Sequence, residues 1–131
     1  MKSEVVVGQA GEYLVASVFF EMGVQCVVAP TMGFDLVAFD GGKTYRVEVK
    51  TASKNYAIKK SLYSFSTSRG SKSKKRISVE SCDVLALVAL PLRRVFFINS
   101  ASLTGKNKRL SQSRFVQGCE EESWREATTW T

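Results

Sequence analysis

Hydrophobic and polar residues follow a helical spacing at the start of the chain and strand-like spacings after it. Residues 3–22 predict a helix, because Ser3 can cap its first turn and Gly23 follows its last residue. Apolar or alternating segments predict strands at 24–29, 34–39, 44–51, 62–67, 84–90 and 95–98. The fifth of these is apolar throughout, which is typical of a buried central strand. This order predicts one domain, residues 1–131, with an α/β sheet core flanked by helices.

The segment after residue 99 gives a weaker pattern. Residues 101–104 are compatible with a helical turn, and 106–114 are polar and basic without a clear period. Gly118 precedes three glutamates at 120–122, which favours a helix start, since acidic residues stabilise the positive end of a helix dipole. Trp124 and Trp130 give this tail apolar surface to bury.

The predicted strands 34–39 and 44–51 bring charged side chains together. Side chains alternate faces along a strand, so Glu48 and Lys50 share one face while Val47 and Val49 point into a core. Asp35 lies beside Glu48 if the two strands pair as a hairpin. Two carboxylates and an amine suit a site that holds a hard divalent cation on oxygen ligands, with the lysine acting on a water or a phosphate oxygen. The alternative is an ordinary cross-strand ion pair on a solvated face.

Composition narrows the possible chemistry. The chain has no histidine, which excludes Ser-His-Asp hydrolysis, Cys-His proteolysis and nucleases with a histidine base. Its three cysteines have no paired spacing, so neither a zinc site nor a disulfide is expected. Hydrolysis by this chain must therefore use carboxylates, lysine and a metal. The absence of a long apolar run and of a convincing signal peptide predicts a cytoplasmic protein.

The charge distribution favours a polyanionic partner. The formal net charge is +7, and from Lys50 through Arg76 there are nine basic residues and no acidic one. The candidate contacts with DNA phosphates are Arg46, Lys54, Lys59, Lys60, Arg69, Lys72, Lys74, Lys75 and Arg76. The interleaved aromatic residues Tyr56, Tyr63 and Phe65 can stack on bases, although core packing is the preferred prediction for Phe65. The alternative is that lysines in this segment serve only solubility.

The strings Gly33-Phe34-Asp35 and Glu48-Val49-Lys50, with Glu12 on the preceding predicted helix, resemble the PD-(D/E)XK nuclease superfamily. The order and the gaps are most like archaeal-type Holliday-junction resolvases, and they are also similar to resolvase-like homing endonucleases. Phenylalanine stands where the superfamily name has proline. The resemblance implies a restriction-endonuclease-like core and a Mg²⁺ site, in which Mn²⁺ can substitute. It adds the Val49 carbonyl and Glu12 to Asp35 and Glu48 as metal ligands, and it places Lys50 at the attacking water or the scissile phosphate.

The predicted function is a Mg²⁺-dependent DNA endonuclease selective for branched DNA. The alternatives are a sequence-specific double-strand endonuclease of the restriction or homing type, a DNA-binding module with a vestigial site, and an RNA-directed nuclease. Cutting two strands needs two sites and each chain has one, so a homodimer is expected, with a tetramer as the alternative. Candidate interface residues are Trp124, Trp130 and Phe96, which can instead cap the core.

Overall fold

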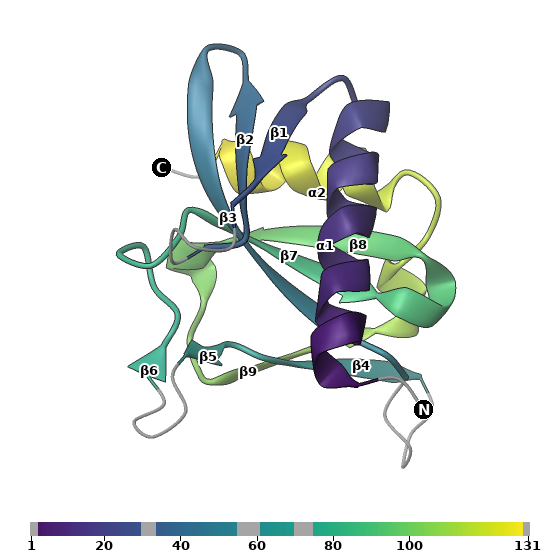
Figure 1. Ribbon diagram of the computed structural model, residues 1–131. Helices are drawn as coiled ribbons and strands as arrows, with labels where there is room; N and C mark the ends of the chain where they lie inside the picture. Colours follow the sequence, from purple (N-terminus) through teal and green to yellow (C-terminus); the bar gives the residue numbers. More distant parts are fainter. Residues whose placement is uncertain (1–2, 30–33, 55–60, 70–74, 130–131) are drawn as a thin grey trace.

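A mixed sheet of five strands forms the centre of the molecule, in the order β1-β2-β3-β7-β8 (Figure 1). The structure is a computed structural model, and it describes residues 3–29, 34–54, 61–69 and 75–129. The five strands are β1 (Gln25–Val28), β2 (Leu36–Asp40), β3 (Lys43–Ala52), β7 (Val84–Ala89) and β8 (Arg94–Asn99). Only the β3–β7 pair is parallel; the other neighbours are antiparallel. The predicted α/β class and the predicted central strand 84–90 are confirmed, because every residue of β7 is buried.

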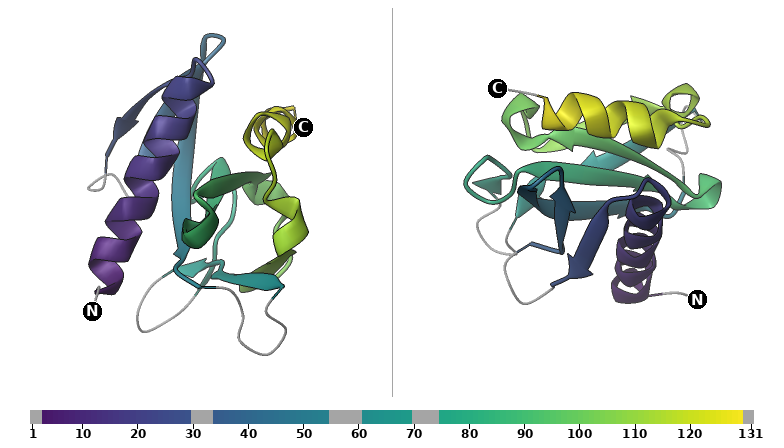
Figure 2. Two further views of the ribbon diagram at one scale, coloured as in Figure 1. Left: turned by 90° about the vertical axis from the view of Figure 1, so that its right-hand side faces the viewer. Right: turned by 90° about the horizontal axis from the view of Figure 1, so that it is seen from above.

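Helix α1 (Glu4–Glu21) packs along one face of this sheet (Figures 1 and 2). As predicted, the Ser3 hydroxyl caps it by accepting a hydrogen bond from the Val6 N–H at 3.2 Å. Gly23 follows the last turn with a φ of 81°, a left-handed conformation that favours glycine. Val15 and Phe19 point from α1 into a core whose sheet side includes Val47.

Helix α2 (Cys119–Thr128) runs along the outer edge of β8. Its side chains satisfy the edge strand: Val95 N–H donates to Glu120 Oε2 at 2.9 Å, and Phe97 N–H donates to Ser123 Oγ at 2.9 Å. Trp124 is only 5% exposed and stacks edge-on against Phe19 and Phe97. Of the two predicted roles for Trp124, core capping is therefore confirmed and a subunit interface is not, because its ring fills the core. Trp130 lies outside the described residues.

The opposite face of the sheet is covered by a two-stranded ribbon, β4 (Leu62–Ser66) and β9 (Asn107–Ser111). The shorter pair β5 (Ser68–Arg69) and β6 (Lys75–Arg76) follows it. Tyr63, Phe65 and Leu110 pack beneath the ribbon in a second apolar cluster. Core packing of Phe65 is confirmed, whereas base stacking by Tyr63 is wrong, since that ring is equally buried. Tyr56 lies outside the described residues.

Short 3₁₀ turns connect the later elements: η2 (Leu90–Leu92), η3 (Ser100–Ser102) and η4 (Gln112–Arg114). The predicted turn near residue 101 corresponds to η3. Phe96, the third candidate interface residue, packs against Phe115 and has the Arg114 guanidinium 4.9 Å from its ring centre. Cys26, Cys82 and Cys119 are free thiols. Among the described helices, none is long and apolar enough to cross a membrane.

Candidate functional site

The candidate site begins where β2 stops pairing with β3. The ladder ends at the Leu36–Val47 pair, but β3 continues to Ala52. Immediately before β2, the Asp35 N–H donates to the Val47 carbonyl at 3.0 Å. The Asp35 carboxylate accepts a hydrogen bond from the Val49 N–H at 2.7 Å. The main chain of β3 thus fixes this carboxylate beside the part of β3 that extends beyond β2.

The alternation of backbone groups along β3 places the Val49 carbonyl on the same side. The Val47 carbonyl and the Val49 N–H both face Asp35, whereas the Arg46 carbonyl accepts from the Asp83 N–H on the β7 side. Since the N–H and C=O of one strand residue point to the same edge, the Val49 carbonyl is directed toward the Asp35 edge. The carboxylate and this carbonyl are oxygen ligands of the type that hard divalent cations prefer.

Glu48 and Lys50 project from the opposite face of β3 to the buried Val47 and Val49, as predicted. The Lys50 ammonium lies 3.9 Å from Glu48 Oε2, and the two side chains are only 24% and 12% exposed. Lys50 Nζ also donates to the Ser68 carbonyl at 3.4 Å, which ties it to β5. This partly desolvated pair holds a positively charged ammonium group next to a carboxylate in the site.

Glu12 comes to the site from α1. Burial, and after it the negative charge of Asp35, raises the pKa of the Glu12 carboxyl above its ordinary value. The two carboxyl groups therefore lie close enough to repel each other when both are ionised. A cation bound between them would relieve that repulsion, as it does wherever two carboxylates share a metal ion.

The predicted ligands do not all surround one point. The structure brings Glu12 close to Asp35, and it brings Glu48 to Lys50. Within the described ranges, no three Asp, Glu, Cys or His side chains are grouped closely enough to form a ready metal cluster. The candidate ligand atoms nevertheless suit a hard cation chemically, because all of them are oxygens, from Asp35, Glu48, Glu12 and the Val49 carbonyl.

Arg46, a predicted phosphate contact, has structural partners. Its Nη2 lies 3.1 Å from Asp83 Oδ1, and its Nη atoms also donate to the carbonyls of Val79 and Glu80 at 2.8 and 3.1 Å. Asp83 Oδ2 in turn accepts from the Arg46 N–H at 2.8 Å. Asp83 thus acts as a hydrogen-bonding group at the start of β7. A phosphate would have to share the Arg46 guanidinium with these partners.

The remaining basic candidates fall around the segment that follows β3. Lys54 is exposed just beyond the strand. Arg69 belongs to β5, and Lys75 and Arg76 form β6. Lys59, Lys60, Lys72 and Lys74 lie outside the described residues. Phosphate binding by this set stays a prediction.

The outer face of the β4–β9 ribbon is a candidate surface that the sequence pattern did not reveal. The register pairs Ser64 with Arg109 and Ser66 with Asn107, while Tyr63, Phe65 and Leu110 face inward. The ribbon also ends near Lys50, because Ser66 Oγ lies 3.0 Å from Ser68 Oγ and Lys50 bonds the Ser68 carbonyl. Residues 107–111 include one apolar side chain, so no hydrophobic alternation marked them as a strand.

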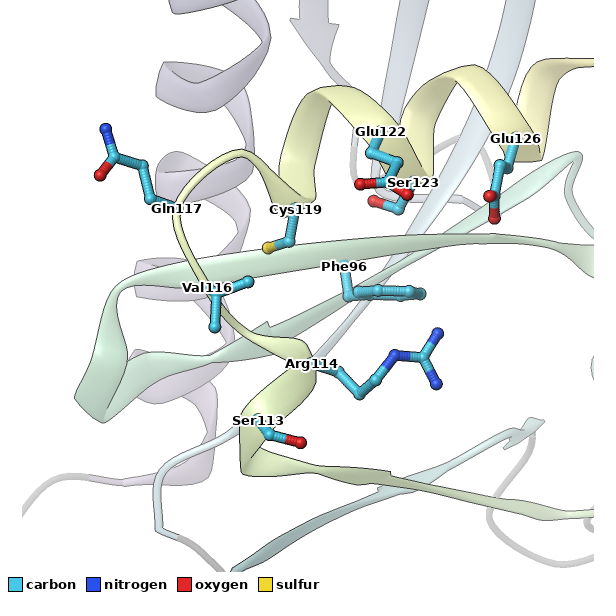
Figure 3. Close-up of a pocket in the computed structure, with 9 residues that line it drawn as sticks. All are labelled: Phe96, Ser113, Arg114, Val116, Gln117, Cys119, Glu122, Ser123 and Glu126. Carbon is cyan, nitrogen blue, oxygen red and sulfur yellow. The ribbon is translucent and has the colours of Figure 1, made fainter.

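A separate hollow of about 210 Å³ lies between α2, η4 and β8 (Figure 3). It is lined by Phe96, Arg114 and Cys119 among others, none of which belongs to the carboxylate site. The Cys119 thiol donates to the Val95 carbonyl at 3.3 Å. Burial, and after it the charge of Glu120, raises the pKa of Cys119 to about 12, so this thiol is not a nucleophile at neutral pH. The catalytic candidates therefore remain at the Asp35 edge.

Comparison with known proteins bears on the fold. No known protein family and no curated protein matches the sequence. Among solved structures, that of a bacterial homing endonuclease, I-Ssp6803I, matches with a TM-score of 0.76 at 15% identity, over 98% of this chain and 95% of that chain. The two chains share one fold. The expected nuclease-like α/β core is thereby confirmed, while a particular likeness to archaeal junction resolvases stays a prediction.

Proposed function

We propose that this protein is a metal-dependent DNA endonuclease that hydrolyses phosphodiester bonds. The observation that carries the proposal is the Asp35 carboxylate, held by the Val49 N–H at 2.7 Å beside the strand that carries Glu48 and Lys50. The fold shared with a homing endonuclease supports it. The excess positive charge of the chain suits a polyanionic substrate.

Asp35, Glu48 and the Val49 carbonyl would hold Mg²⁺ or Mn²⁺, with Glu12 contributing directly or through water. When bound, such a cation would activate water as a Lewis acid and offset charge developing at the phosphate. Asp35 contributes a carboxylate whose position is set by the main chain rather than by a flexible partner. Lys50 contributes a partly buried positive charge, which is worth more there than in bulk water for orienting a water or stabilising a phosphate oxygen.

Branched DNA is the substrate predicted from the likeness to resolvases. A specific observation favours a second candidate, site-specific cleavage of duplex DNA. A two-stranded β-ribbon fits the major groove, where arginine pairs with guanine and asparagine with adenine. The outer face of the β4–β9 ribbon carries Arg109 and Asn107 and ends beside Lys50. The duplex candidate therefore has a surface able to read bases next to the site.

The test is a cleavage assay with labelled four-way junction, a randomised duplex library, single-stranded DNA and RNA, each with Mg²⁺, Mn²⁺ or EDTA. Metal-dependent cutting of the junction alone supports the branched-DNA candidate, and cutting of a selected duplex sequence supports the other. Preferential cutting of RNA would contradict both DNA candidates and indicate an RNA-directed nuclease. Tight DNA binding with no cleavage under either metal would leave a DNA-binding module with a vestigial site.

The oligomer belongs to the same proposal. Double-strand cleavage needs two sites, so we expect a homodimer, or a tetramer built from two dimers. Light scattering at micromolar concentration, with and without DNA, measures this directly. A mass of one chain in both conditions would contradict it.

A further inference from the structure

Gly11 lies where α1 packs closely against β3. A Cβ added at Gly11 would overlap Thr51 Oγ1 and would lie 3.0 Å from Thr51 Cβ, which is tighter than nine in ten contacts of real Cβ atoms. The other glycine within α1 differs, since a Cβ at Gly8 would have no atom within 4 Å. Only one of the two therefore sets the spacing between the helix and the sheet.

The partner in this contact is unusual in its own right. Thr51 Oγ1 is buried, and no hydrogen-bond partner for it exists among the described residues. A glycine inside a helix and an unpaired buried hydroxyl are each locally unfavourable. The close approach is therefore not explained by the local stability of either element.

The contact joins the two elements that carry the candidate site. Gly11 directly precedes Glu12 on α1, and Thr51 directly follows Lys50 on β3. Any change in the distance between these two backbones moves Glu12 relative to Asp35, whose carboxylate is bonded to the same strand at Val49.

We propose that the Gly11–Thr51 contact is a positioning device, which sets the distance of Glu12 from Asp35 and thereby the geometry of the metal site. This inference rests on the proposed function. Gly11 is a positioning residue and not a catalytic one, because it acts only by determining where Glu12 lies.

The size of the effect follows from the overlap. In Gly11→Ala, rotation of the Thr51 side chain can remove the overlap with Oγ1 but not the 3.0 Å contact with Cβ, so α1 and β3 must separate by a few tenths of an ångström. A misplacement on the order of 1 Å in an active site lowers a rate by about 100-fold. A shift of a few tenths of an ångström is smaller, so we expect Gly11→Ala to cleave DNA about 3- to 10-fold more slowly, with unchanged DNA affinity.

The experiment compares Gly11→Ala with Gly8→Ala as the matched control. Gly8→Ala should keep the wild-type rate and stabilise the helix. The double variant Gly11→Ala with Thr51→Ala should recover part of the rate, because it removes the overlapping hydroxyl and methyl groups. In a Glu12→Gln background, Gly11→Ala should cause little further loss, since its effect passes through Glu12.

Crystal structures of the Gly8→Ala and Gly11→Ala variants supply a readout that does not depend on cleavage. A wider α1–β3 spacing and a shifted Glu12 in Gly11→Ala alone would support the inference. An unmoved helix, a wild-type rate, or an equal loss in the Glu12→Gln background would overturn it. If the wild type neither cleaves DNA nor binds Mn²⁺ in a direct titration, the proposed function fails. A moved helix would then show a packing contact only, and the positioning role would be overturned with it.

Discussion

Two regions of the sheet use the same kind of hydrogen bond in different electrostatic settings. At the β8 edge, Glu120 accepts from the Val95 N–H at 2.9 Å; beyond the end of β2, Asp35 accepts from the Val49 N–H at 2.7 Å. Glu120 is 8% exposed and also pairs with Arg94 at 3.2 Å, which neutralises it. Beside Asp35 lies the Glu12 carboxyl, whose pKa is raised by burial and then by the negative charge of Asp35.

The difference lies in the neighbouring charge. A carboxylate that closes a strand edge and pairs with an arginine has its charge balanced within the protein, so it stabilises the fold. A carboxylate beside another carboxylate lacks that balance from this neighbour and attracts a cation. The main-chain hydrogen bond positions both groups equally well. The charge of the neighbouring group therefore distinguishes the structural carboxylate of Glu120 from the candidate metal ligand Asp35. Substitution of Asp35 should lower the cleavage rate and leave the fold stable, whereas substitution of Glu120 should lower stability and leave the cleavage rate unchanged.

The largest expected effect is loss of cleavage in Asp35→Asn. The amide oxygen can still accept from the Val49 N–H, so the fold should persist, but the negative charge for the cation is gone. We expect cleavage to fall by at least about 100-fold, with DNA affinity largely unchanged. Glu48→Gln should behave in the same way. Full activity of either variant in a metal-dependent assay would remove these residues from the site.

Lys50→Ala tests the positive charge of the site separately. It should also be inactive, by about 100-fold or more, because the charge beside Glu48 that orients a water or a phosphate oxygen is lost. Since no proposed metal ligand changes, raising the Mg²⁺ or Mn²⁺ concentration should not restore the rate. Rescue by metal would mean that Lys50 acts instead through cation binding.

Glu120→Ala should show the reverse behaviour. It removes the acceptor of the buried Val95 N–H and leaves the partly exposed Arg94 side chain without its carboxylate. We expect the free energy of unfolding to fall by about 1–3 kcal/mol, while cleavage below the melting temperature stays near wild type. Glu120→Gln is the matched partner of Asp35→Asn and should fold and cleave. Denaturant unfolding and cleavage rates together measure the contrast, and a catalytic defect in folded Glu120→Gln would break it.

The sequence predicted those parts of the fold that leave a local pattern. The helix before Gly23, the hairpin around Glu48 and the buried strand β7 all follow from periodicity and turn residues. Strand β9 was missed because one inward apolar residue, Leu110, gives no alternation, and its partner β4 lies far away in sequence. The burial of Trp124 likewise depends on contacts between distant elements.

In the candidate site, too, some features follow from the local sequence and others depend on contacts between distant elements. That Glu48 and Lys50 share a face follows from strand geometry alone. The proximity of Glu12 to Asp35 was suggested only by resemblance, since it depends on how α1 crosses the sheet. The structure also shows that the close contact between α1 and β3 lies at Gly11 and not at Gly8. The pairing of Glu48 with Lys50 is also a feature that sequence spacing does not determine.

The basic residues between 72 and 76 are predicted to contact DNA phosphates. Neutralising Lys72, Lys74, Lys75 and Arg76 together should weaken DNA binding. Each lost phosphate contact should lower the slope of log affinity against log salt by roughly 0.9. Four lysines or arginines elsewhere, such as those at 2, 43, 93 and 125, provide a charge-matched control. An unchanged slope in the first variant would mean that this segment does not contact the phosphates.

The smallest effect is expected at a third carboxylate that accepts from a strand N–H. Asp83 accepts from the Arg46 N–H at 2.8 Å and pairs with the Arg46 side chain at 3.1 Å, so it should behave like Glu120 and not like Asp35. Both side chains are more than a third exposed, and solvent screening limits the pair to about 1 kcal/mol or less. Asp83→Asn should therefore cleave DNA normally and unfold slightly more easily at neutral pH.

The pH dependence of that small effect has a definite sign. Burial raises the pKa of Asp83, but the hydrogen bonds and the charge of Arg46 outweigh burial and leave the pKa below its ordinary value. A carboxyl whose pKa is lowered by folding stabilises the protein above its unfolded pKa, and this contribution disappears as the pH falls through the folded pKa. The unfolding free energies of wild type and Asp83→Asn should thus differ at neutral pH and converge in acid. Denaturant unfolding across that range measures the difference. A constant gap at every pH would show that the ion pair is not its source, and a cleavage defect would place Asp83 with Asp35 in the site.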